Sequence, residues 1–249
     1  MAEKSARILA LILAAGKGSR MGSSLPKPLV LLNHQPLISY LIHTVRAISV
    51  TDIALVVGYG ADLVVGEIGD AVNYYIRQPE QLGTGHAVTC ALKLIEQYDS
   101  VLILMGDNPL LSPKTIQNML EIQKVTNSPA VILTGQFDRH FPYARVVRDD
   151  HHRLIKCVEE RDATVDEKTI TEYMTSQFLF AVPVLLEMLP QLRPHPQTGE
   201  TYLTDLINYY VQAGYDVETV IAENYQELVG LNTPEEVAWA ENYLNSRTK

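Results

Sequence analysis

Continuous apolar runs recur along the first half of the chain, and a short loop follows each of them. Residues 8–15, 53–57 and 101–105 form runs of strand length without polar alternation. Strands that are buried on both faces have this pattern, because helices cover both faces of a parallel sheet. Stretches with helical spacing lie between the runs, as at residues 37–48 and 113–123. The pattern therefore predicts an α/β fold, with a Rossmann-like, mostly parallel sheet flanked by helices.

The second half of the chain is less regular than the first. We read one domain over residues 1–249, with a regular half at 1–125 and a less regular half at 126–249. In the regular half the pattern also predicts a strand at 72–76 and helices at 61–68 and 86–96. For the other half it predicts strands at 130–134, 143–147, 154–158, 177–182 and 217–222 and helices at 183–189, 202–213 and 234–245.

Composition narrows the class of protein. With 249 residues, 47% of them hydrophobic, the chain can bury a sizeable core, yet no apolar stretch approaches the length of a membrane span. The net charge of -9 disfavours a nucleic-acid surface. Cys90 and Cys157 form no CxxC pair, which argues against a structural zinc site and suits a reducing cytoplasm. We therefore expect a cytoplasmic protein that binds neither nucleic acid nor membrane.

The loop after the first apolar run is rich in glycine and cations. Gly16 and Gly18 allow a backbone to approach an anion closely, and Lys17, Arg20 and Lys27 can pair with phosphate. The spacing matches neither GxGxxG nor GxxxxGK[ST], so a dinucleotide fold and a P-loop are not supported. A surface turn with solvated cations, or a secretory signal that includes the apolar run, are the alternatives. The loop favours a phosphate site at the carboxyl edge of the sheet.

Two further loops follow predicted strands and belong to the same edge, at residues 78–85 and 106–109. Asp107 directly follows a strand in the second of these loops. Its carboxylate could hold Mg²⁺ beside phosphates, or it could cap the turn before Pro109. The sequence contains no zinc motif of the HExxH type and no GxSxG nucleophile elbow, so covalent catalysis is not indicated.

These motifs resemble those of sugar nucleotidyltransferases. LAAGKGSRM at 13–21 and LPKPL at 25–29 are similar to the signature of that superfamily. QPEQLGTGHA at 78–87 and the Gly-Asp at 106–107 resemble more specifically the uridylyltransferase domain of bifunctional N-acetylglucosamine-1-phosphate uridylyltransferase/glucosamine-1-phosphate acetyltransferase. The resemblance continues through PYAR, VEERDA, GETYLTD and VGLN, and it covers nearly the whole chain in order.

The resemblance implies a role for each matching position. Catalysis would rest on Arg20 and Lys27, and Asp107 and Asn232 would bind Mg²⁺. The regular half would bind the nucleotide through Leu13, Ala14, Ala15, Gly16, Lys17, Gly18, Gln78, Gln81, Gly83 and Thr84. The other half would bind the sugar through Tyr143, Ala144, Glu159, Met174, Tyr202 and Thr204.

The implied reaction condenses a nucleoside triphosphate, with UTP expected, and a sugar-1-phosphate into a nucleoside-diphosphate sugar and pyrophosphate. Acceptor specificity stays open, because the chain departs from the family at sugar-side positions. Met174-Thr175-Ser176 replaces Asn-Thr-Gly, Met105 replaces a tyrosine, and Ala144 replaces a glycine. The alternatives are a transferase for dTTP, CTP or another acceptor, and a regulatory module that binds nucleotide without turnover.

Hexapeptide repeats, which would build the acetyltransferase β-helix of the bifunctional proteins, are absent from the sequence. We therefore expect no acetyltransfer by this polypeptide. Because that β-helix trimerises the bifunctional proteins, we expect a monomer or a weak homodimer here.

Overall fold

The apolar runs form the strands of a central sheet in the computed structural model, which describes residues 6–247. In the first half of the chain these strands are β1 (Ile8–Ala14), β4 (Asp52–Val57), β5 (Tyr74–Arg77) and β6 (Ser100–Met105). In the second half they are β7 (Ala130–Gln136), β8 (Ala144–Arg148), β9 (Leu154–Val158), β10 (Glu172–Ala181) and β11 (Val217–Ile221). A separate hairpin consists of β2 (Leu31–Leu32) and β3 (Gln35–Pro36).

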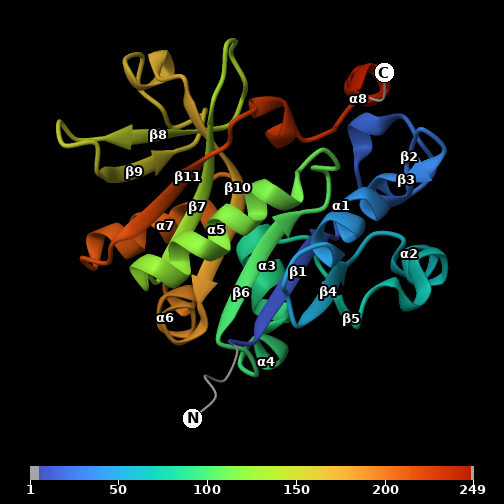
Figure 1. Ribbon diagram of the computed structural model, residues 1–249, viewed down its shortest axis with the longest axis horizontal. Helices are drawn as coiled ribbons and strands as arrows, with labels where there is room; N and C mark the ends of the chain where they lie inside the picture. The colour runs from blue at the N-terminus through green and yellow to red at the C-terminus, as the bar shows by residue number, and fades with distance from the viewer. Residues whose placement is uncertain (1–5, 248–249) are drawn as a thin grey trace.

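The sheet has the strand order β11-β7-β10-β6-β1-β4-β5 (Figure 1). Strand β1 pairs in parallel with β4 and β6, and β11 pairs in parallel with β7. Strand β10 runs antiparallel to both of its neighbours, β6 and β7. Every strand along this path except β10 therefore points the same way, which confirms the predicted Rossmann-like fold. Strands β8 and β9 extend from β10 as an antiparallel pair.

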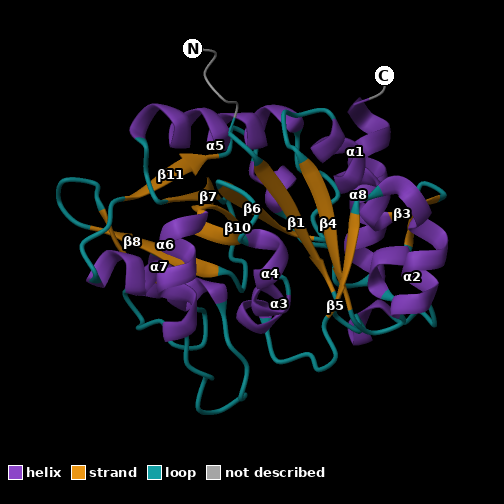
Figure 2. Ribbon diagram, turned by 90° about the horizontal axis from the view of Figure 1, so that it is seen from below, coloured by secondary structure: helices purple, strands orange, loops and turns teal. Residues whose placement is uncertain are grey.

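Helices cover both faces of the sheet, as Figure 2 shows. The helices over one face include α1 (Leu37–Arg46) and α5 (Pro113–Thr126), whereas α3 (Thr84–Cys90), α4 (Leu92–Ile95), α6 (Val182–Met188) and α7 (Leu203–Gln212) lie over the other. Helices α2 (Ala61–Ile68) and α8 (Pro234–Arg247) join the first layer through buried apolar residues. Two buried apolar clusters result, one on each side of the sheet.

Alternation along β1 shows why an unbroken apolar run is required. Leu9, Leu11 and Leu13 pack into one cluster, and Ala10 and Ile12 pack into the other. Successive side chains of a strand point to opposite faces, so a strand that is covered on both sides has no position for a polar residue. The central strand thus delivers the following loop to a fixed place at the carboxyl edge.

The largest departure from the predicted elements is β10, which begins at Glu172 rather than near residue 177. A bulge lies between Met174 and Phe178, and Ser176 has a φ of 63°. Buried polar residues Glu172 and Thr175 also interrupt the apolar pattern in this stretch. The sequence signal for a strand is therefore lost where the strand is most irregular.

A second departure concerns the helix predicted at residues 86–96, which is divided into α3 and α4. Ala91, which separates them, has a φ of -95° and a ψ of 0°. The remaining helices of the described chain agree with the prediction to within a few residues at each end. Within residues 6–247, no helix combines the length and the apolar character that crossing a membrane requires.

Candidate active site

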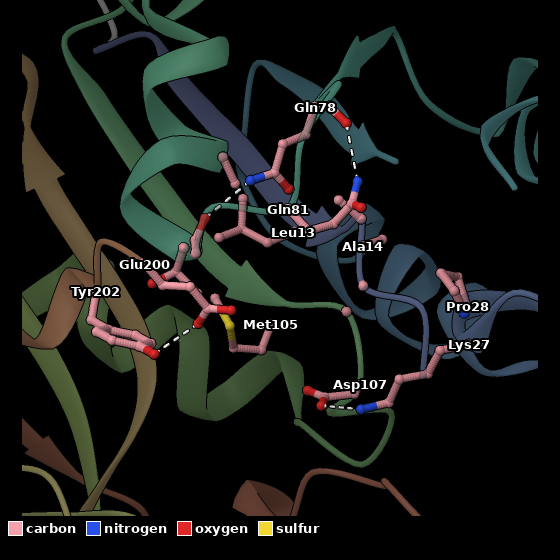
Figure 3. Close-up of a pocket in the computed structure, with 16 residues that line it drawn as sticks. Leu13, Ala14, Lys27, Pro28, Gln78, Gln81, Met105, Asp107, Glu200 and Tyr202 are labelled. Atoms are coloured by element: carbon pink, nitrogen blue, oxygen red, sulfur yellow. Dashed lines mark hydrogen bonds and ion pairs between the residues drawn. The ribbon is translucent and has the colours of Figure 1, made fainter. Parts of the chain in front are cut away.

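A cavity of about 290 Å³ opens at the carboxyl edge of β1 and β6. Many of the residues predicted to bind nucleotide line this cavity, together with Lys27, Asp107 and Tyr202: Leu13, Ala14, Ala15, Gly16, Gln78, Gln81, Gly83 and Thr84. Figure 3 shows the labelled members of this set around the opening. The loops at 16–27, 78–85 and 106–109 therefore meet at one edge, as their positions after parallel strands predict.

The cavity lining also includes residues that the sequence prediction did not assign to the site. These are Pro28, Ala87, Met105, Gly106 and Glu200. Glu200 lies in the GETYLTD stretch, so the motif pointed to its neighbourhood without selecting it. Ala87 and Pro28 are apolar wall residues, and no sequence pattern distinguishes such residues from core positions.

The two glycines of the first loop serve different purposes. Gly16 lines the cavity, and a Cβ there would meet no atom within 4 Å. Gly18 has a φ of 65°, and a Cβ on it would lie 2.6 Å from the Cβ of Lys27. Gly18 therefore lets Lys27 pack against the loop, whereas Gly16 leaves open space beside the backbone.

Cations and oxygen ligands converge at one end of the cavity. The Lys27 Nζ atom lies 2.5 Å from Asp107 Oδ2 and 2.7 Å from Asn232 Oδ1, and the pair with Asp107 is visible in Figure 3. Arg20 Nη2 donates to the same Asn232 oxygen at 2.9 Å. The structure thus brings together two predicted catalytic cations and two predicted metal ligands, although Asn232 lies 205 residues from Lys27 in sequence.

Glutamine side chains form the opposite end of the cavity. Gln78 Nε2 donates to Gly83 O at 3.1 Å, and Gln81 Nε2 donates to Gln78 O at 3.3 Å. The loop is also tied to the second half of the chain, because Thr201 N donates to Leu82 O at 2.9 Å. These contacts hold two carboxamides at the end of the cavity that lies away from the cations (Figure 3).

The sugar-side residues named in the sequence prediction are not all at the cavity wall. Tyr202 is at the wall, where its hydroxyl donates to Glu200 Oε2 at 2.7 Å. Met174 is 1% exposed and packs in the same buried cluster as Ala144. Thr204 is also buried, and its hydroxyl hydrogen-bonds to Glu159. These residues lie in the second half beside α7 and β8, and their role in sugar binding stays a prediction.

Two carboxyl groups in this region are shifted toward the neutral form. Burial raises the pKa of Glu159, and the hydrogen bond from Thr204 and the charge of Arg161 only partly oppose it. Burial also raises the pKa of Asp205, at the start of α7. A carboxyl group in this situation gains from a ligand that donates a hydrogen bond to it.

Tyr143 and Lys17 lie away from the cavity lining. The Tyr143 hydroxyl accepts a hydrogen bond from Gly230 N at 3.1 Å, and burial, more than the nearby Asp107 charge, raises its pKa to about 12. Lys17 Nζ lies 5.5 Å from the centre of the Tyr59 ring, a cation–π contact on the outer side of the loop.

The described residues contain no cluster of three or more His, Cys, Asp or Glu side chains that could hold a metal ion. The set at Lys27 is of another kind, since it offers one carboxylate and one amide oxygen. Such a set suits a metal ion that takes its remaining ligands from phosphate and water.

Comparison with known families agrees with this arrangement. The family described as the MobA-like NTP transferase domain matches residues 10–202. The chain belongs to this family. Membership confirms the predicted class of enzyme, a nucleotidyltransferase, and the matched region includes the cavity residues from Leu13 to Tyr202.

Similar proteins support the more specific resemblance. The chain is 38% identical over 241 residues to "Bifunctional protein GlmU" of Pelotomaculum thermopropionicum, an alignment that covers 96% of this chain and 52% of the relative. It is 37% identical over 244 residues to the Aquifex aeolicus protein of the same name, with 94% and 53% covered. The chain thus spans about half the length of these relatives.

A solved structure shares the fold. The structure titled "The Crystal Structure of UDP-glucose pyrophosphorylase complexed with UDP-glucose" superimposes with a TM-score of 0.77 at 16% identity. The match covers 97% of this chain and 99% of the other. The nucleotidyltransferase fold of this chain is therefore the same from end to end as that of a protein little related in sequence.

Proposed function

We propose that this protein is a Mg²⁺-dependent nucleotidyltransferase that condenses UTP with a sugar-1-phosphate and releases pyrophosphate. One observation carries the proposal. Lys27, Arg20, Asp107 and Asn232 come from both ends of the chain and meet at one end of a cavity of about 290 Å³. A protein that had kept only the fold would have no requirement for this convergence.

The shape of the cavity suits a nucleotide in one orientation. The phosphates would lie toward Gly16 and Lys27, where open backbone and positive charge favour anions. The base would lie toward Gln78 and Gln81, since carboxamides can donate to and accept from the edge of a pyrimidine. The names of the relatives and of the structural neighbour support uridine as this base.

Asp107 and Asn232 fit a hard divalent cation. Both direct an oxygen at the same ammonium group, so two donors of the type that Mg²⁺ prefers are already focused on a cation. Bound there, Mg²⁺ would offset negative charge on the triphosphate. In that state Lys27 would exchange its contacts with these oxygens for contacts with phosphate.

The residues of the chain account for catalysis without a general base. A sugar-1-phosphate has its second pKa near 6, so its oxygen is already largely ionised at neutral pH. That oxygen attacks the α-phosphorus, and the bond from this phosphorus to the bridging oxygen of pyrophosphate breaks. Lys27 and Arg20 would stabilise the charge that moves onto the phosphate oxygens, and the loops would hold the reactants in line.

The acceptor would lie between Asp107 and the wall formed by Met105, Glu200 and Tyr202. Carboxylate and phenol groups there can bind sugar hydroxyls. We propose a hexose-1-phosphate, with N-acetylglucosamine-1-phosphate and glucose-1-phosphate as the first candidates. A cytoplasmic location and a monomeric or weakly dimeric state stay predictions.

The test measures pyrophosphate release with Mg²⁺ over a grid of UTP, dTTP and CTP against both sugar phosphates. We expect the highest kcat/KM with UTP and one of the two acceptors. Release with dTTP or CTP but not with UTP would overturn the base assignment. UTP binding without release on any acceptor would favour the regulatory module instead. A chelator should abolish turnover, and added Mg²⁺ should restore it.

A further inference from the structure

The segment that carries Asn232 is fixed to the Asp107 loop at several points. Leu231 N donates to Asp107 O at 2.9 Å. Asn108, which is 3% exposed, donates from Nδ2 to Leu228 O at 2.8 Å. Residues 228–232 therefore lie along the loop that follows β6, in a register set by main-chain contacts.

Gly230 makes the closest approach within this segment. A Cβ on Gly230 would lie 3.4 Å from the carboxylate atoms of Asp107, so the Asp107 side chain rests directly against its backbone. Any movement of Gly230 therefore changes the space beside the Asp107 carboxylate and the position of Asn232, two residues later. The one bond at Gly230 that comes from outside both segments is its donation to the Tyr143 hydroxyl, at 3.1 Å.

Tyr143 is itself held in place from two sides. Its ring packs against Phe141 and Phe137, with centroids 5.4 and 5.8 Å apart. Its main-chain oxygen accepts from Arg145 Nη1 at 2.7 Å, and the fully buried Arg145 forms an ion pair with Glu160. A hydroxyl that is held this way can fix the position of the amide that donates to it.

From these contacts we infer that Tyr143 is a positioning residue for the metal site. Its hydroxyl holds Gly230 so that Asn232 and Asp107 face the same point before a metal ion arrives. This inference rests on the proposed function, because it takes Asp107 and Asn232 as the metal ligands. It differs from the sequence prediction, in which Tyr143 contacts the sugar.

The experiment measures Mn²⁺ binding by the electron paramagnetic resonance signal of the free ion. It uses the full chain with a saturating amount of a non-hydrolysable UTP analogue, and the analogue alone as the blank. Tyr143→Phe should weaken Mn²⁺ binding about three- to tenfold, the usual range for losing one hydrogen bond. Asp107→Asn should lose the binding that depends on the protein. Circular dichroism would verify that each variant is folded.

Tyr225→Phe is the matched control. Its ring packs in the same aromatic group, 4.9 Å from Phe137, and its hydroxyl bonds to Asp138 rather than to the Asn232 segment. This variant should bind Mn²⁺ like the unmodified protein. Equal weakening in Tyr143→Phe and Tyr225→Phe would indicate general loosening of the aromatic group and would overturn the inference.

Steady-state kinetics separate the remaining outcomes. We expect Tyr143→Phe to need more Mg²⁺ for half-maximal rate while the KM for the sugar phosphate stays unchanged. Unchanged Mn²⁺ binding with a raised sugar-phosphate KM would overturn positioning and restore the sugar role. Unchanged Mn²⁺ binding in Asp107→Asn would instead contradict the metal site of the proposed function itself.

Discussion

The two halves of the chain contribute to the cavity in different ways. In the first half, loops that follow parallel strands place side chains directly at the wall, as with Gln78, Lys27 and Asp107. In the second half, Tyr202 and Glu200 reach the wall, whereas Met174 and Thr204 are buried behind it. The parallel half thus presents its ligand groups at one edge, and the antiparallel half mainly supports a wall.

This contrast explains why one half can be conservative and the other variable in chemistry. Strand ends in the parallel half fix where a phosphate can lie, because the backbone itself forms the site. Side chains of β8, β9 and α7 shape the space for the acceptor without altering that backbone. We therefore expect substitutions in the first half to affect the reaction, and substitutions in the second half to affect stability or acceptor choice.

Lys27→Ala should have the largest effect and would sharpen the comparison. We expect kcat to fall by about 10²–10³, as when a group that stabilises developing charge is removed. UTP affinity should fall by about tenfold or less. Pyrophosphate release and calorimetric titration with UTP measure the two quantities. Lys114→Ala, which removes an exposed lysine paired with Glu223, is the control and should change neither. Equal losses in turnover and binding would refute the transition-state role.

Arg148→Met should affect stability without affecting nucleotide binding. Arg148 makes two bonds to the buried carboxylate of Glu172, at 2.8 and 2.6 Å, and removing it leaves that carboxylate unpaired. We expect a loss of about 2–3 kcal/mol in the free energy of unfolding, measured with urea. Arg153→Ala, at an exposed pair with Asp149, should cost well under ~1 kcal/mol. If UTP binding to the folded protein also weakens, the two halves are more closely coupled than we infer.

Glu159→Gln should stabilise the protein while impairing the acceptor site. Burial raises the pKa of Glu159 in the folded state, so the native state binds more protons than the unfolded state. This carboxyl group favours folding below its ordinary pKa of about 4.3, and its contribution is lost as pH rises through the raised value. At neutral pH we expect glutamine to add about 0.5–1.5 kcal/mol to the free energy of unfolding.

That gain should disappear as the pH falls toward 4, which thermal melts of both proteins between about pH 4 and 8 would show. Glu67→Gln, on the exposed face of α2, is the control and should show no such pH-dependent gain. A gain that is constant over the range would mean that the charge of Glu159 is not its source. In kinetic assays the KM for the sugar phosphate should rise.

Met105→Tyr should have the smallest effect and tests which half governs the acceptor. Met105 lines the cavity at the end of β6, where the family resemblance implies a tyrosine. We expect the KM for the sugar phosphate to change by about tenfold or less, because an apolar wall residue discriminates modestly. UTP affinity should be unchanged by calorimetry. Val125→Tyr, at an exposed position of α5, is the control. A large loss of UTP binding would contradict the separation of the two halves.

Much of the nucleotide side could be predicted from the sequence, for physical reasons. Unbroken apolar runs identify strands that are covered on both faces, and ligand loops follow their ends. Asn232 could not be paired with Asp107 in this way, because no spacing rule joins residues 125 positions apart. Only the family resemblance suggested that pair, and the structure shows both side chains at Lys27.

The second half was harder to predict because its signals are irregular. The bulge at Met174 to Phe178 and the positive φ of Ser176 break the alternation of β10. Glu200 was missed because a glutamate beside a glycine in a loop has the pattern of an ordinary exposed residue. Distances across the sheet, rather than any local pattern, decide which of these residues reach the cavity.

The position of β10 has a consequence for how the chain folds. Strand β7 pairs with β10 and β11, both of which come later in the sequence, and it is separated from β6 by β10. During synthesis β7 must therefore wait for at least 36 further residues (136 to 172) before it has a neighbour in the sheet. Until then its apolar edge is open, so a ribosome-bound intermediate should need protection from aggregation.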